Sequence, residues 1–137
     1  MHQHITHIAL VVKDYDEAIE FYTNKLGFTL LEDTVLDEKK RWVTIAPAGA
    51  KECSLLLAKA ATEEQLKSVG NQTGGRVFLF LFTDNIERDY AKMIEKNIRF
   101  VRPLSVQAHG KVAVFEDLYG NLWDLIEPNE NNKGIIK

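Results

Sequence analysis

The feature that most constrains this chain is a repeat of pattern between its two halves, which lie about 70 residues apart. Each half begins with an apolar, β-branched segment, at residues 5–12 and 77–82. A segment with apolar residues at helical spacing follows, after Asp14 in the first half and Asp84 in the second. Three short apolar segments then complete each half. We therefore expect two copies of one strand–helix–strand–strand–strand unit, packed around a common site.

This pattern predicts an α+β fold of two strand–helix–strand–strand–strand (βαβββ) modules. We expect one domain of 137 residues, with a first module at about 5–58 and a second at about 76–128. The connection at about 59–75 includes Thr62 and Gln65 at capping-box spacing, which predicts a short helix. Its remainder is rich in glycine and polar residues and predicts a flexible linker.

Several local features of the second half carry their own predictions. Asp84 is expected to cap the helix that follows it. The polar residues 107–111 indicate a loop, and Gly120 indicates a tight turn between the last two strands. The adjacent Glu116 and Asp117 are interpreted as solvated.

Composition excludes several classes of function. The net charge is −3, and the densest basic cluster, residues 39–41, follows two acidic residues and is interpreted as a solvated turn rather than a nucleic-acid stripe. No apolar run approaches the roughly 20 residues that span a bilayer, and the N-terminus does not resemble a secretory signal. Cys53 is the only cysteine, so no internal disulfide can form. We expect a cytoplasmic protein without membrane or nucleic-acid partners.

Two motifs resemble a known superfamily. The stretch HIALVVKDYDEAIEFY at residues 7–22, followed by Leu26-Gly27-Phe28, resembles the opening module of the vicinal oxygen chelate superfamily. The stretch FEDLYGNLWDLIE at residues 115–127 resembles the closing hairpin of its second module. This superfamily holds glyoxalase I, extradiol dioxygenases, fosfomycin-resistance enzymes and bleomycin-binding proteins. The resemblance implies two βαβββ modules whose curved mixed sheets form a cleft. It does not identify a reaction, because one scaffold hosts several chemistries.

The resemblance also implies where a metal would bind. His7 matches the histidine of the first module, and Asp124 matches the carboxylate of the second module, so both are candidate metal ligands and catalytic residues. Phe78 stands where the second histidine is expected, and the fourth position falls near Ser54 or Leu55. Two ligands are fewer than the three protein ligands of catalytic zinc sites.

Additional groups could complete the ligand set, and the predicted pair has other uses. Glu52 and His109 could supply a missing donor. Alternatively, His7 and Asp124 could form a pair that moves a proton without metal, or a buried polar pair that only fixes the sheets. A neighbouring imidazole would lower the pKa of the Asp124 carboxyl.

Aromatic and cationic residues near the predicted cleft are candidate ligand contacts. Aromatic residues of this kind belong to the core by default, but an aromatic face on the cleft would suit a flat or apolar ligand. Arg76 and Arg102 could hold an anion, although surface arginines are commoner. The candidate ligand-binding residues are Phe78, Phe80, Trp42, Trp123, Arg102 and His109, with Phe82 on the same strand face.

Two functional hypotheses remain open from the sequence. The first is a small-molecule enzyme, a lyase or dioxygenase of the glyoxalase type, that uses Fe, Zn, Ni or Mn or the His7–Asp124 pair. The second is a metal-free protein that binds an antibiotic-like small molecule, as bleomycin-resistance proteins do; Phe78 at the expected histidine position favours it. In either case we expect a homodimer, because exposed sheet edges need covering.

Overall fold

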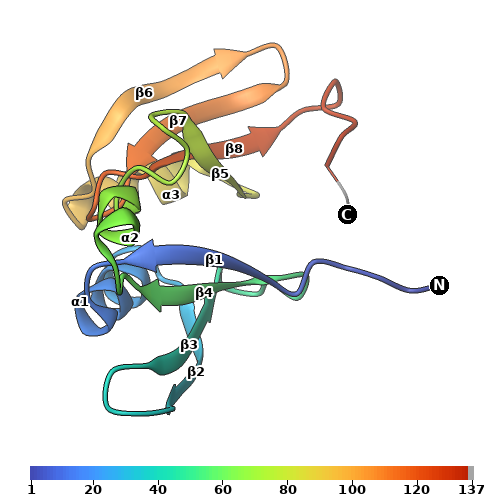
Figure 1. Ribbon diagram of the computed structural model, residues 1–137. Coiled ribbons are helices and arrows are strands. Elements are labelled where there is room, and N and C mark those ends of the chain that lie inside the picture. Colours follow the sequence, from blue (N-terminus) through green and yellow to red (C-terminus); the bar gives the residue numbers. More distant parts are fainter. Residues whose placement is uncertain (136–137) are drawn as a thin grey trace. The chain divides into compact units, whose positions relative to one another are not determined.

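The computed structural model describes residues 1–135 and divides into two compact units, Met1–Gln72 and Thr73–Lys137. The first unit contains one mixed four-stranded sheet with the order β1-β4-β3-β2 (Figure 1). Strand β1 runs parallel to β4, and the other neighbours are antiparallel. Its elements are β1 (His7–Val12), α1 (Tyr15–Glu20), η1 (Phe21–Lys25), β2 (Thr29–Val35), β3 (Arg41–Ala46), β4 (Ser54–Lys59) and α2 (Glu63–Ser68).

The second unit repeats this topology. Its sheet has the order β5-β8-β7-β6, with β5 parallel to β8 and the other neighbours antiparallel. Its elements are β5 (Val77–Phe82), α3 (Ile86–Glu95), β6 (Phe100–Gln107), β7 (Gly110–Glu116) and β8 (Leu122–Pro128). The predicted α+β fold of two similar modules is therefore confirmed. None of the helices within residues 1–135 has the length and apolar character that a bilayer crossing requires.

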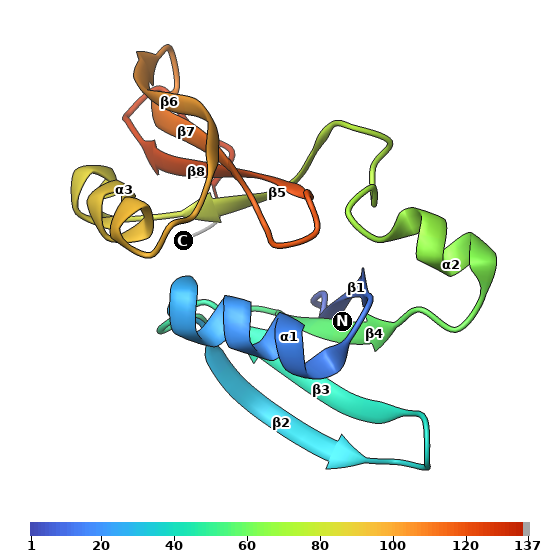
Figure 2. The ribbon, with the colours of Figure 1, turned by 90° about the vertical axis from the view of Figure 1, so that its left-hand side faces the viewer.

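In each unit the long helix covers one face of the sheet, as Figure 2 shows for α1. The core lies between the helix and this face because side chains alternate along each strand. The buried core of the first unit includes Leu10, Val12, Ala18, Tyr22, Val43, Ile45, Leu55 and Leu57. The corresponding residues of the second unit include Ile86, Met93, Ala113, Phe115, Trp123 and Leu125. We call the opposite surface of each sheet its helix-free face.

The two long helices differ by a π-helical turn. Thirteen positions separate the N-cap Asp14 from Gly27, whose φ is 76°, whereas twelve separate the N-cap Asn85 from Asn97, whose φ is 63°. The first unit accommodates the additional residue in η1, where the Leu26 N–H donates to the carbonyl of Phe21, five residues earlier.

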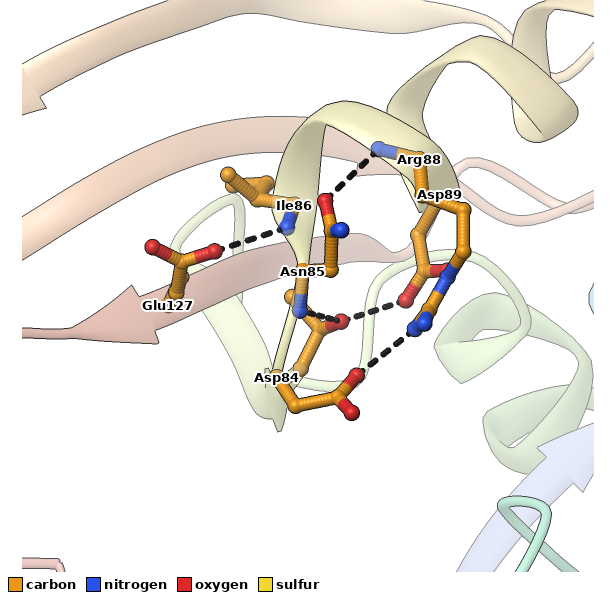
Figure 3. A network of polar contacts seen from close by, with 7 residues as sticks. Asp84, Asn85, Ile86, Arg88, Asp89 and Glu127 are labelled. Atoms are coloured by element: carbon orange, nitrogen blue, oxygen red, sulfur yellow. Dashed lines mark hydrogen bonds and ion pairs between the residues drawn. The ribbon is translucent and has the colours of Figure 1, made fainter.

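The start of α3 corrects one prediction. Asn85, not Asp84, caps the helix, because its side chain accepts a hydrogen bond from the Arg88 N–H at 3.1 Å (Figure 3). Asp84 instead pairs with the Arg88 guanidinium at 2.6 Å. Glu127 of β8 accepts the Ile86 N–H at 3.0 Å, so the first turn of the helix is tied to the sheet.

Two further predictions for this unit need correction. The loop expected at residues 107–111 is only a turn at residues 108–109, because β6 continues to Gln107 and β7 begins at Gly110. Asp117 is buried rather than solvated, since it accepts hydrogen bonds from the backbone N–H groups of Tyr119 and Asn121 and from the Asn121 amide, at 2.8–2.9 Å. Its carboxylate holds the turn that Gly120, with a φ of 100°, closes.

Candidate functional site

His7 lies on the helix-free face of the first unit. It is the first residue of β1 and is paired with Ser54 of β4, and its Nδ1 lies 2.6 Å from the buried Ser54 Oγ. Its ring also meets Trp42 edge-on, with ring centroids 5.7 Å apart. Because Ser54 engages Nδ1, Nε2 is the ring nitrogen available to other partners.

Asp124 lies on the helix-free face of the second unit. Its neighbours across the sheet are Phe80 of β5 and Val114 of β7, and Val114 is in turn paired with Arg102 of β6. Within residues 1–135, the buried Asp124 Oδ1 has no hydrogen-bond partner. An unsatisfied buried acceptor is costly, so this oxygen is a site where a bound molecule could donate a hydrogen bond.

Burial raises the pKa of the Asp124 carboxyl above its ordinary value, and the positive charge of Arg102 opposes this effect only in part. This is opposite to the direction expected for a carboxylate beside an imidazole. Burial therefore makes the proton-bearing form of Asp124 easier to reach than for a solvated carboxyl, and in that form Asp124 can donate a hydrogen bond or a proton. The pairing of His7 with Asp124 stays a prediction, because the two residues belong to different units.

The aromatic residues of β5 are not core residues, which corrects their default interpretation. Phe80 and Phe82 have 67% and 55% of their surface exposed, and both share a sheet face with Asp124. Phe78 is partly exposed, at a shift in register between β5 and β8. These residues give the helix-free face of the second unit an apolar, aromatic edge.

The other predicted ligand contacts divide into two groups. Trp123 is 3% exposed and stacks on Phe115 in the core, so it does not lie on the helix-free face, contrary to its place among the candidates. Trp42 is partly exposed on the helix-free face of the first unit. Arg102 and His109 are exposed, as is Arg76.

Internal equivalence between the units locates the metal-ligand positions. The N-cap residues of α1 and α3 provide a common reference, and counting back five residues from each gives Ala9 in β1 and Phe80 in β5. The strand partner of Ala9 is Leu56, and the strand partner of Phe80 is Asp124. Leu56 is therefore the first unit's equivalent of Asp124.

The same count makes Phe78 the equivalent of His7, whereas strand pairing across the register shift gives its neighbour Val77, and both residues are apolar. Each helix-free face thus carries one potential metal ligand and one apolar side chain at the matching position. The fourth position is Leu56 rather than Ser54, and neither leucine nor phenylalanine can coordinate a metal. No cluster of three or more His, Cys, Asp or Glu suited to a metal occurs within residues 1–135. The donor set therefore does not fit the usual catalytic centre with three protein ligands.

A pocket on the first unit was not predicted from the sequence. It has a volume of about 660 Å³ and opens beside the ends of β3 and β4. Its lining consists of Tyr15, Lys39, Lys40, Arg41, Trp42, Leu56, Leu57, Ala58, Lys59, Ala60, Ala61 and Gln65. Residues 39–41 are the basic cluster that we interpreted from the sequence as a solvated turn. This cluster is the one sequence feature that could have indicated the pocket.

Comparisons with known proteins agree with the fold. A family model described as Glyoxalase/Bleomycin resistance protein/Dioxygenase superfamily matches residues 4–125. An uncharacterized protein of Shewanella frigidimarina (strain NCIMB 400) is 60% identical over 131 residues, which cover 95% of this chain and 97% of the relative. The uncharacterized protein YurT of Bacillus subtilis (strain 168) is 31% identical and covers 87% and 94% of the two chains.

Solved structures show the same similarity. The crystal structure of UcmS2 has a TM-score of 0.81 and 27% identity, covering 93% of this chain and 99% of that chain. The crystal structure of TnmS3, an antibiotic binding protein from Streptomyces sp. CB03234, has a TM-score of 0.75 and 28% identity, covering 93% and 98%.

Proposed function

Because the chain belongs to the glyoxalase/bleomycin resistance protein/dioxygenase superfamily, we propose that it binds a small organic molecule on its helix-free faces without a metal ion. The observation that carries this proposal is the identity of residues 56 and 78. Leucine and phenylalanine occupy the positions that would complete a metal-binding set, and they provide apolar contact surface instead.

The side chains around these positions support ligand binding. Phe80 and Phe82 expose two phenyl rings, and such rings contribute large apolar contact areas when a ligand covers them. Asp124 offers an unsatisfied oxygen that can fix the orientation of a ligand donor. The similarity to TnmS3, which is an antibiotic binding protein, is consistent with this function.

A second candidate function is metal-free acid–base catalysis. The contact of His7 Nδ1 with Ser54 orients the ring, and in the tautomer whose Nδ1–H donates to Ser54 Oγ, Nε2 is a proton acceptor. The raised pKa of Asp124 makes this carboxyl a proton donor closer to neutral pH. A lyase of the glyoxalase type would need such a pair, whereas the donor set gives no comparable support to a metal-dependent lyase or dioxygenase.

Thermal-shift measurements test the proposal. The purified chain is screened against hydrophobic and polycyclic compounds, in EDTA and again with added Ni²⁺, Zn²⁺, Fe²⁺ or Mn²⁺. We expect compounds that stabilise the protein equally in both conditions, by about 2.7 kcal/mol at a concentration of 100 times Kd. Phe80→Ala should weaken this binding, and His7→Ala should weaken it less than tenfold.

The result that would contradict metal-free binding is stoichiometric, micromolar metal binding that both His7→Ala and Asp124→Ala abolish. Ligand binding that appears only with added metal would contradict it too. Substrate turnover in EDTA that falls at least 100-fold in both variants would favour the acid–base function instead.

A further inference from the structure

The pocket of the first unit contains four cationic residues and no carboxylate in its lining. We propose that it binds an aromatic carboxylate, or an equivalent planar anion, with the ring against Trp42 and the anionic group beside the lysines. This inference rests on the proposed small-molecule binding and names the chemical class of the ligand.

The charge of the pocket is unbalanced. Arg41 is already neutralised, because its guanidinium pairs with Asp16 at 2.9 Å and with Asp33 at 2.7 Å. The three lysines of the lining, Lys39, Lys40 and Lys59, form no ion pair with a carboxylate among the residues that the structure describes. In a protein with a net charge of −3, this local excess of positive charge selects anions.

Lys39 and Lys40 stand on an ordered turn. The Asp37 carboxylate accepts hydrogen bonds from the backbone N–H groups of Lys39 and Lys40, each at 2.8 Å, and these bonds, with a smaller contribution from the charge of Lys40, lower the pKa of Asp37. The backbone N–H groups of Leu36 and Asp37 also donate to the carbonyl of Lys40, at 2.9 and 3.1 Å. Such a turn reduces the ordering cost of binding, because its backbone is already fixed.

The adjoining walls are also held in place. Arg41 lies over the Tyr15 ring, 5.1 Å from its centroid, and its backbone N–H donates to the Tyr15 hydroxyl at 3.2 Å. Across the pocket, the Gln65 side chain accepts the Ala61 N–H at 2.6 Å at the start of α2. These contacts fix the positions of the residues that surround the lysines and the apolar part of the lining.

The apolar part of the lining suits a planar ring. Trp42, Leu56 and Ala58 belong to adjacent strands on the helix-free face, and Trp42 provides a flat aromatic surface. Trp42 also meets the His7 ring edge-on, so the pocket lies beside His7, although His7 is not part of its lining. The volume of about 660 Å³ falls within the ~300–1,000 Å³ of small-molecule sites.

Isothermal titration calorimetry with two matched probes tests this inference. The probes are 2-naphthoate and 2-naphthamide, which share a ring system and differ in charge. We expect 2-naphthoate to bind at least tenfold more tightly than 2-naphthamide, with an affinity that falls as the salt concentration rises. The double variant Lys40→Gln/Lys59→Gln should weaken 2-naphthoate at least tenfold and leave 2-naphthamide unchanged.

The control double variant is Lys25→Gln/Lys51→Gln, which changes the net charge equally but lies outside the pocket lining. It should leave both affinities within twofold of wild type. Equal loss in the two double variants would overturn the inference, since the anion would then respond only to overall charge. Trp42→Leu should weaken both probes, and unchanged binding would remove Trp42 from the site.

The remaining outcomes separate this inference from the proposed function. If both probes bind equally, or if only neutral compounds of the screening panel bind, the anionic class is wrong while small-molecule binding stands. If neither probe binds but panel compounds bind to the Phe80 surface, the pocket assignment fails alone. If no compound binds at all, the proposed function fails with it.

Discussion

Asp124 shows most clearly how one residue departs from a purely structural role. Its Oδ1 is buried without a hydrogen-bond partner in the described part of the chain, and its pKa is raised by burial. The equivalent residue of the first unit, Leu56, fills the same position without a polar group. The fold therefore does not require a carboxylate here, and the carboxylate costs stability that a leucine would not.

We accordingly predict that Asp124→Leu stabilises the protein by about 1 kcal/mol at pH 7. The folded-state pKa lies above the unfolded value, so the folded protein holds the proton more tightly and loses stability as the pH rises through that folded pKa. The gain of the variant should therefore shrink as the pH falls from the folded-state pKa toward the unfolded value of about 3.9, because the folded carboxyl becomes neutral over this range. Urea unfolding at pH 4 and pH 7 measures both effects.

Asp117→Leu is the matched control, because the Asp117 carboxylate is buried with its hydrogen bonds made. This variant should lose about 3 kcal/mol of unfolding free energy, because the groups that donate to the carboxylate would be left unsatisfied. If Asp124→Leu destabilised the protein to a similar extent, Asp124 would have to be held by a partner, and its proposed availability to a ligand would be wrong.

For single residues, the sequence predicted which ones belong to the candidate site better than it predicted their burial and hydrogen bonds. His7 and Asp124 could be placed on their strands by side-chain alternation and resemblance. The burial of Asp117 could not be predicted. A carboxylate in a polar turn looks solvated until the backbone N–H groups that donate hydrogen bonds to it are known. The choice of Asn85 over Asp84 as N-cap depends in the same way on one residue of register between strand and helix.

Among the elements, β7 tolerates only glycine at its first residue, Gly110, directly after the turn from β6. Gly110 has a φ of 148°, and a Cβ there would lie 2.3 Å from the Glu127 carbonyl oxygen of β8. Gly110 is paired with Pro128, so this close approach lies within the sheet itself. A side chain would have to push β8 away from β7.

We predict that Gly110→Ala costs about 3 kcal/mol of unfolding free energy, since a well-packed sheet cannot relax freely. Gly74→Ala is the control: its φ is 69°, but nothing lies within 4 Å of the added Cβ. It should cost only about 1–2 kcal/mol, the conformational term alone. Chemical denaturation of both variants makes the comparison, and equal losses would show that the contact with β8 contributes nothing.

The order of elements was predictable because hydrophobic spacing and caps act locally. The π-helical turn η1 was not, because its extra residue becomes visible only when the first helix is compared with the second at equivalent caps. The exposure of Phe80 was missed for a different reason. Aromatic residues at alternate positions of an apolar strand predict burial, and only the tertiary fold shows which face of the sheet the helix covers.

For the whole molecule, the repeat explains why each unit carries an incomplete site. Equivalent positions hold His7 and Phe78 on one pair of strands, and Leu56 and Asp124 on the other. The two copies have therefore diverged in complementary ways. The first unit has a histidine and a cationic pocket, and the second has a carboxyl group and exposed phenyl rings.

The same exposed phenyl rings lead to our last prediction, a homodimer. Phe80 and Phe82 stand on β5, an edge strand of its sheet, and single-chain proteins seldom leave two such neighbouring rings in water. A second copy that covers about 800 Å² per chain would protect the strand edge and cover the rings in part, so the ligand and the second chain would share this surface. Light scattering should then give a mass near twice 15.6 kDa.

The double variant Phe80→Ser/Phe82→Ser should shift this mass to the monomer at about 10 μM, because the apolar centre of an interface supplies most of its affinity. Val106→Ser provides the control, since Val106 is 78% exposed on β6, the edge strand at the other side of the same sheet. It should leave the dimer intact. A monomeric wild type, or a dimer that both variants leave unchanged, would contradict a dimer contact through these rings and leave ligand binding as their proposed role.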